Sequence, residues 1–168
     1  NKYKTWEKVV LAVAEVMTEK GIIPQKSFRI IKQKVDFDVD RINEIEKITR
    51  HDVIAVLTNL SEYIGPDSRY IHMGMTSSDL LDTSLAIQCR DAGKIILRKL
   101  KKFRKVLLNN AVKYKETFQI GRSHGVHAEP ITFGLKNALW SEELKRNIKR
   151  WEQSLKNISV GKISGAVG

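Results

Sequence analysis

The chain has 168 residues, of which 42% are hydrophobic, and its 30 Lys and Arg against 19 Asp and Glu give a formal net charge of +11. This length supports an ordinary hydrophobic core, so the fold does not depend on disulfides, and Cys89 is the one cysteine. No apolar run approaches the roughly 20 residues of a membrane helix and no secretory signal pattern opens the chain, so we expect a cytoplasmic protein.

The first amphipathic helices can be placed from apolar spacing. Apolar residues at i, i+3, i+4 and i+7 predict a helix over residues 5–20, and Gly21 then ends it. A short helix over residues 27–34 follows, and another begins near Asp38 or Asp40. These short elements predict a small helical domain.

The helical pattern slips at residues 49–52, which predicts a junction between two helices. A new apolar stripe covers residues 53–64, and Asp52 is suited to cap its first turn. A junction would expose Arg50, His51 and Asp52, which offer a cation, a titratable ring and an acceptor, as binding of a ribose phosphate requires. Such triplets are also common on ordinary surfaces.

Thr76 and Asp79 have the spacing of a capping box, so a long helix is predicted to begin there and to cover residues 78–115. At that length it would extend about 55 Å, which is typical of helical bundles. Hydroxyls and free backbone N–H groups at residues 76–78 could bind a carboxylate or a phosphate. Simple capping of the helix explains the same residues equally well.

Residues 121–130 gather two histidines, an arginine, a hydroxyl and a carboxylate between a glycine and a proline, which predicts a shaped loop. Pro130 then suits the first turn of a further amphipathic helix that reaches residue 155. No segment with the period of a strand rivals these helices. The sequence therefore predicts an all-α chain.

His124 is the strongest candidate for chemistry, because an imidazole can give or take a proton near neutral pH while Arg122 and Ser123 hold an anion. The alternative is a buried, hydrogen-bonded histidine. His124 and His127 lack the further ligands of a zinc site, so neither a metal nor another cofactor is predicted. His72 and Cys89 have no evident partners and are interpreted as structural.

Four separated motifs, in order along essentially the whole chain, resemble the bacterial adenylosuccinate lyases of the fumarase and aspartase superfamily: Thr49–Val53, His72–Asp79, Gly121–Pro130 and Gly161–Gly168. The resemblance implies β-elimination of fumarate from adenylosuccinate, which gives AMP. It also implies the same reaction on the succinylated carboxamide intermediate of de novo purine synthesis.

By the same resemblance, His124 is the general acid that protonates the departing nitrogen, and no cofactor or metal is required. Arg50, His51 and Asp52 would contact the nucleotide. Thr76, Ser77 and Ser123 would contact the succinyl carboxylates. Ser123 departs from the threonine usual in the family, but the hydroxyl is kept.

The resemblance also implies an architecture and an assembly. Residues 1–75 would form a small amino-terminal helical domain, and residues 76–168 the first part of the central long-helix bundle. Family members are homotetramers whose active sites are shared between three subunits. Relative to the family, the chain begins after an Arg-Tyr strap that holds the nucleotide phosphate, and the loop with the general-base serine lies beyond Gly168. We therefore expect the 168-residue chain to be inactive by itself.

Two alternatives remain open at this stage. Another amine or amidine lyase of the superfamily would keep the His124 segment but fail to bind a purine nucleotide. A basic helical module that binds nucleic acid would depend on residues 98–105, although their helical spacing favours a solvated helix face. Steep weakening of binding with salt would distinguish the nucleic-acid module.

Overall fold

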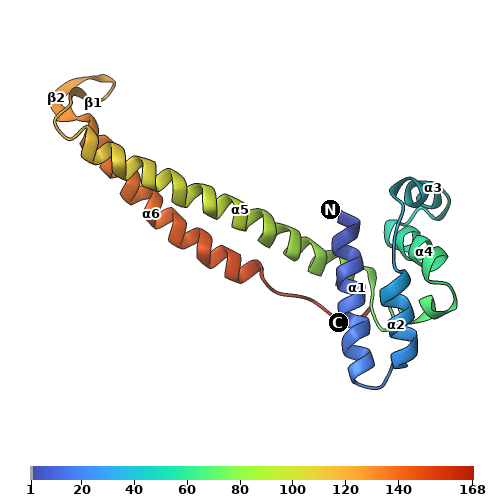
Figure 1. Cartoon of the computed structure of the whole chain (residues 1–168). Coiled ribbons are helices and arrows are strands. Elements are labelled where there is room, and N and C mark those ends of the chain that lie inside the picture. Colours follow the sequence, from blue (N-terminus) through green and yellow to red (C-terminus); the bar gives the residue numbers. More distant parts are fainter. Residues whose placement is uncertain (1) are drawn as a thin grey trace. The chain divides into compact units, whose positions relative to one another are not determined.

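The structure is a computed structural model that describes residues 2–168, and it is built mainly from helices (Figure 1). In chain order its elements are α1 (Lys2–Glu19), α2 (Gln25–Lys34), α3 (Val39–Thr49), α4 (Asp52–Ile64), the 3₁₀ helix η1 (Pro66–Tyr70), α5 (Ser77–Lys113), β1 (Phe118–Ser123), β2 (Val126–Thr132) and α6 (Phe133–Ile158). The predicted helical fold class is confirmed. None of the helices within residues 2–168 combines the length and apolar character needed to cross a membrane.

The chain forms two compact units. The first contains residues up to Gln88 together with Val160–Gly168, and the second contains Cys89–Ser159. Helix α5 contributes to both units. The predicted domain boundary near residue 75 stays a prediction.

The larger of two apolar clusters in the first unit takes residues from all of α1 to α5. Its buried members are at most 8% exposed: Trp6, Val9, Val10, Ile31, Ile42, Ile45, Val53, Ala55, Val56, Leu60, Ile64, Ile71 and Leu80. In α1, α3 and α4 these positions recur mainly at three- and four-residue spacing, so one face of each of these helices is buried. The apolar pattern that predicted the helices is thus also the pattern that packs them.

Helices α3 and α4 form a helical hairpin with a connection of two residues, Arg50 and His51. Arg50 ends α3 in a left-handed conformation with φ 51°, and His51 is the N-cap of α4. The prediction that Asp52 caps α4 is wrong, because Asp52 is already the first helical residue. Its negative charge there still interacts favourably with the helix dipole.

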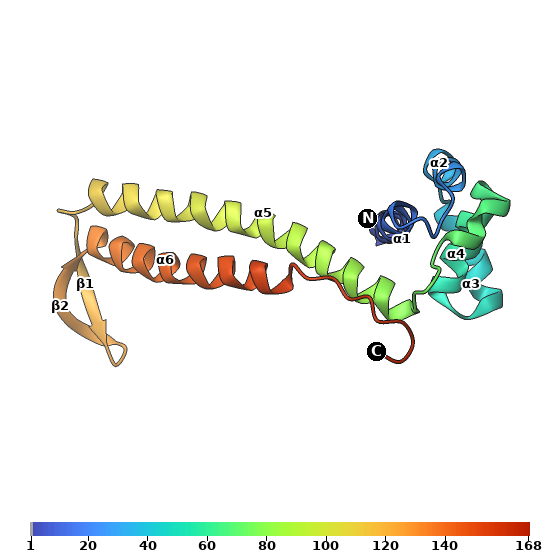
Figure 2. The ribbon, with the colours of Figure 1, turned by 90° about the horizontal axis from the view of Figure 1, so that it is seen from below.

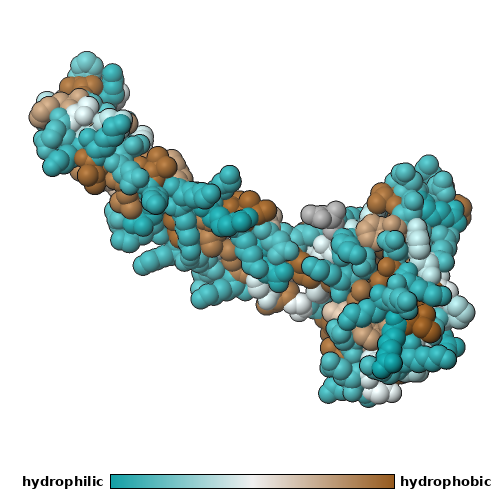
Figure 3. Space-filling model, viewed as in Figure 1, coloured by the Kyte–Doolittle hydropathy of each residue, from teal (hydrophilic) through white to brown (hydrophobic). Residues whose placement is uncertain are grey.

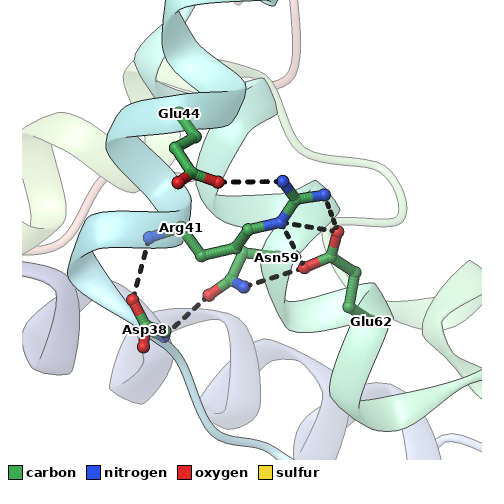
Figure 4. A network of polar contacts seen from close by, with 5 residues as sticks. All are labelled: Asp38, Arg41, Glu44, Asn59 and Glu62. Carbon is green, nitrogen blue, oxygen red and sulfur yellow. Dashed lines mark hydrogen bonds and ion pairs between the residues drawn. The ribbon is translucent and has the colours of Figure 1, made fainter.

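A polar network closes this hairpin at the end away from the connection (Figure 4). Arg41 donates to Glu62 at 2.8 Å and to Glu44 at 3.1 Å. Asn59 accepts from the backbone N–H of Asp38 at 2.9 Å and donates to Glu62 at 3.1 Å. The hydrogen bond from Arg41 also lowers the pKa of Glu62. The start of α3 is therefore tied to the end of α4.

In the second unit, α6 runs antiparallel beside the later part of α5, as both ribbon views show (Figures 1 and 2). The indole Nε1 of Trp151 donates to the backbone oxygen of Gly93 at 2.9 Å. A Cβ at Gly93 would overlap the side chain of Leu155, and one at Gly134 would lie 2.5 Å from the backbone oxygen of Ala111. Glycine at these two positions allows the helices to approach closely.

A β-hairpin replaces the loop expected at residues 121–130. Strand β1 pairs antiparallel with β2, and Pro130 lies in β2 opposite Ile120. Helix α6 begins at Phe133, where the Thr132 hydroxyl accepts from the N–H of Leu135 at 3.0 Å. The predicted loop and the predicted helical position of Pro130 are therefore wrong. A two-stranded sheet has two edges, and a proline without an N–H is tolerated at an edge.

Candidate functional site

His124 lies at the tip of the β-hairpin. His124 and Gly125 form the two-residue turn between the paired residues Ser123 and Val126, with φ values of 54° and 76°. Two consecutive positive φ values are the mark of a type I′ turn, whose twist matches that of the two strands. The turn places the imidazole on a short, hydrogen-bonded support instead of on a long loop.

The imidazole of His124 is free to meet a ligand. His124 and Ser123 are exposed, and no hydrogen bond joins the His124 ring to any other group within residues 2–168. Arg122 donates to the backbone oxygen of Gly125 at 3.4 Å, which places a cation beside the turn. The alternative of a buried, hydrogen-bonded His124 is wrong for this chain.

Gly121 shapes the hairpin below its tip. The register shifts between Ile120 and Arg122, where β2 carries one additional residue. A Cβ at Gly121 would overlap the backbone oxygen of Glu129 on that bulged strand. Bulges bend a strand and change the direction of its side chains, so Gly121 helps to set where the His124 ring is presented.

The connection between α3 and α4 carries the second group of candidates. Arg50 is exposed, and its backbone N–H donates to Glu46 at 2.8 Å. The Nδ1 of His51 accepts from the N–H of Ile54 at 3.4 Å, which assigns the proton of the neutral ring to Nε2. Asp52 is half-buried and lies 3.8 Å from the ammonium group of Lys2. A cation, a ring N–H and a carboxylate are thus presented within three residues.

The amino terminus of α5 carries the third group. The backbone N–H of Thr76 donates to the Asp79 carboxylate at 2.9 Å, so the predicted capping box is formed from that side. The hydroxyls of Thr76 and Ser77 make no hydrogen bond to another group in the part of the chain that the structure describes. They are available to an anion at the positive end of a 37-residue helix.

His72 is a candidate that sequence reasoning missed. It has a left-handed backbone with φ 63°, and its buried Nδ1 has no hydrogen-bond partner. Burial lowers the pKa of His72, against the opposing effect of the Asp79 charge. An unpaired buried nitrogen is costly unless a ligand or water satisfies it. Its place in the same motif as Thr76 was the one signal available from sequence.

The candidates fall into both units. Arg50, His51, Asp52, Thr76 and Ser77 belong to the first unit, whereas Ser123 and His124 belong to the second. Among described residues, no hydrogen bond or ion pair joins the α3–α4 connection to Thr76 or Ser77. No three His, Cys, Asp or Glu side chains within residues 2–168 gather in a way that could hold a metal ion.

A model of the lyase family matches residues 2–168 of this chain. The chain belongs to the lyase family. This lyase chain is 45% identical over 168 residues to the adenylosuccinate lyase of Bacillus subtilis, and 50% identical over 167 residues to that of Synechocystis sp.. These alignments cover 100% and 99% of the chain but 39% of each relative. The resemblance stated from the motifs is confirmed.

Solved structures support the same family. The crystal structure of a fumarate lyase from Mesorhizobium sp. BNC1 superposes on 99% of this lyase chain with a TM-score of 0.93. Its sequence is 29% identical, and 40% of its length is covered. The fold of the chain is therefore that of the fumarate-lyase superfamily, as the motifs implied.

Proposed function

We propose that the protein to which this chain belongs is an adenylosuccinate lyase of purine biosynthesis. It would release fumarate from adenylosuccinate to give AMP, and from the succinylaminoimidazole carboxamide ribotide to give the carboxamide ribotide. The observation that carries the proposal is the 45% and 50% identity to adenylosuccinate lyases along the whole chain. The proposal needs no metal or cofactor.

His124 is the general acid of the proposed reaction. A general base, which the family resemblance assigns to a serine, takes a proton from the carbon next to a carboxylate. The electrons of that C–H bond form the C=C bond of fumarate as the C–N bond breaks. The bonding electrons pass to the nitrogen, which takes a proton from the imidazolium of His124. A cation at this position also stabilises the charge that develops on nitrogen. The free, exposed ring at the tip of the turn supports this role.

The other candidates would bind the two ends of the substrate. In the proposal Arg50, His51 and Asp52 contact the nucleotide, since a guanidinium suits phosphate and a carboxylate accepts from ribose hydroxyls. Thr76, Ser77 and Ser123 contact the carboxylates of the succinyl group. The unpaired hydroxyls at the start of α5, with the dipole of that helix, support the second assignment.

A homotetramer with shared active sites is part of the same proposal. Apolar side chains stay exposed along the paired helices α5 and α6, where Figure 3 shows brown surface. The exposed members are Ile95, Ile96, Phe103, Val106, Leu108, Val112, Leu135, Leu139 and Trp140. Burial of such faces against other helices is the usual reason for their composition. A cytoplasmic location is part of the same proposal.

The test is cleavage of adenylosuccinate by the complete protein, followed by absorbance. His124→Ala should abolish cleavage, whereas His127→Ala, at an exposed histidine of the same hairpin, should retain far more activity. For shared sites, a mixture of His51→Ala and His124→Ala proteins should regain activity that neither shows alone. A lyase for another amine would leave adenylosuccinate intact and would not be inhibited by AMP. A nucleic-acid module would bind polyanions with steep salt dependence.

A further inference from the structure

The glycine-rich segment 161–168 has no helix or strand, yet two side chains of α5 hold it in place. The Thr83 hydroxyl accepts from the backbone N–H of Lys162 at 2.9 Å and donates to the backbone oxygen of Lys162 at 3.0 Å. Asp79 lies four residues earlier, so both side chains project from one face of the helix. The segment is therefore fixed at two points one turn apart.

Asp79 makes the denser set of contacts. Its carboxylate is fully buried and accepts from the backbone N–H groups of Thr76 at 2.9 Å, Ser164 at 3.0 Å and Gly165 at 3.0 Å. The ammonium group of Lys162 lies 3.2 Å away. These donors, that of Thr76 first, hold the pKa of Asp79 well below its usual range. A buried carboxylate with this many donors is ionised and satisfied.

These contacts link the first turn of α5 to a distant part of the sequence. The Thr76 N–H points inward to Asp79, and the hydroxyls of Thr76 and Ser77 have no hydrogen-bond partner among the described residues. The Lys162 ammonium offsets the charge of Asp79, which would otherwise repel an anion bound at the start of α5. The buried carboxylate itself is too enclosed to touch a substrate.

We propose that Asp79 is a positioning residue: it locks residues 162–165 onto the first turn of α5 and so holds Thr76 and Ser77 in the geometry that receives the substrate's carboxylates. Thr83 is the second point of this lock. The inference rests on the proposed function, because the carboxylates in question are those of the succinyl group. It adds to that function a buried residue that acts through Thr76 and Ser77.

The decisive variant is Asp79→Asn in the complete protein, because it keeps the size of the side chain but puts an NH₂ group where N–H donors converge. Asp82→Asn is the matched control, since Asp82 is an exposed carboxylate on the same helix. Inhibition constants for fumarate and AMP are measured for each variant. Asp79→Asn should raise the inhibition constant of fumarate about tenfold or more, which is the scale of a lost charge-assisted hydrogen bond. It should leave the inhibition constant of AMP nearly unchanged. Asp82→Asn should change neither.

Equal weakening of both ligands, or a response like that of Asp82→Asn, would overturn the positioning role. The lock has a separate readout in amide hydrogen exchange, which should be faster at residues 162–165 in Asp79→Asn and in Thr83→Val than in Thr83→Ser. Unchanged exchange overturns the lock itself. If wild type binds neither fumarate nor AMP, the proposed function fails, and exchange still decides the lock. If Asp79→Asn does not fold, the inhibition constants for fumarate and AMP are measured on Thr83→Val instead.

Discussion

The hairpin turn predicts that two inactive variants of His124 differ in stability. His124 has φ 54°, in the left-handed region where a Cβ approaches the following carbonyl oxygen. His124→Gly removes that contact, whereas His124→Ala keeps it. Both variants remove the proposed acid. The glycine variant should therefore be the more stable of two inactive proteins.

The size of the difference follows from two opposing effects. An L-residue in the left-handed region costs about 1–2 kcal/mol, which glycine avoids. Glycine also gives the unfolded chain more conformational freedom, which lowers the free energy of unfolding by about 0.4–1 kcal/mol. We therefore expect His124→Gly to be about 0.5–1 kcal/mol more stable than His124→Ala. At an ordinary helical position the order is reversed, with glycine about 1 kcal/mol less stable than alanine.

Urea denaturation followed by tryptophan fluorescence measures both differences, since Trp140 and Trp151 lie in the unit that carries the turn. Ala92→Gly, at an exposed position within α5, is the control and should lower stability. If His124→Ala is as stable as His124→Gly, or more so, the strain assigned to the turn is not there. Activity in either variant would contradict the role of the imidazole.

Three other perturbations test separate contacts. Gly121→Ala should destabilise the second unit by about 1–3 kcal/mol, because the new Cβ would overlap the backbone oxygen of Glu129; an unchanged urea midpoint would show that the bulge relaxes freely. Trp151→Phe removes the hydrogen bond to the backbone oxygen of Gly93 and should cost about 0.5–1.5 kcal/mol in thermal or urea unfolding, whereas no loss would mean that water replaces the indole. The variant His72→Gln tests the burial of an imidazole. Because the folded state lowers the pKa of His72, the stability that neutral His72 contributes is fully present above the pKa of His72 in the unfolded chain. That stability is lost as the pH falls below about 6.5. Wild type should therefore lose stability relative to His72→Gln as the pH falls below about 6.5, and parallel pH profiles would contradict this.

Local signals predicted the helices well. Gly21, the acceptor Asp38 and the pair of Thr76 and Asp79 mark helix ends through contacts within a few residues, so sequence reasoning can find them. The long helix predicted over residues 78–115 is observed as Ser77–Lys113. The spacing of apolar residues then indicated which face of each helix is buried.

The hairpin and the lock depend on contacts that local patterns do not reveal. Apolar residues do alternate with polar ones in both strands, at Phe118 and Ile120 and at Val126 and Ala128, but the alternation is short. The turn also places a histidine where asparagine or glycine is the usual signal. The partners of Asp79 in the glycine-rich segment lie 83 to 86 residues further along the chain, so its spacing to Thr76 revealed only the local cap. The orphaned nitrogen of His72 likewise becomes visible only once the fold buries it.

The central claim is that the complete protein is an adenylosuccinate lyase whose acid is His124. Its most direct test is the rate of adenylosuccinate cleavage by wild type, His124→Ala and His127→Ala, with AMP and fumarate identified as products. We expect equal amounts of both products from wild type, no cleavage by His124→Ala and substantial cleavage by His127→Ala. Wild type that leaves adenylosuccinate intact, or His124→Ala that cleaves it at the wild-type rate, would contradict the account.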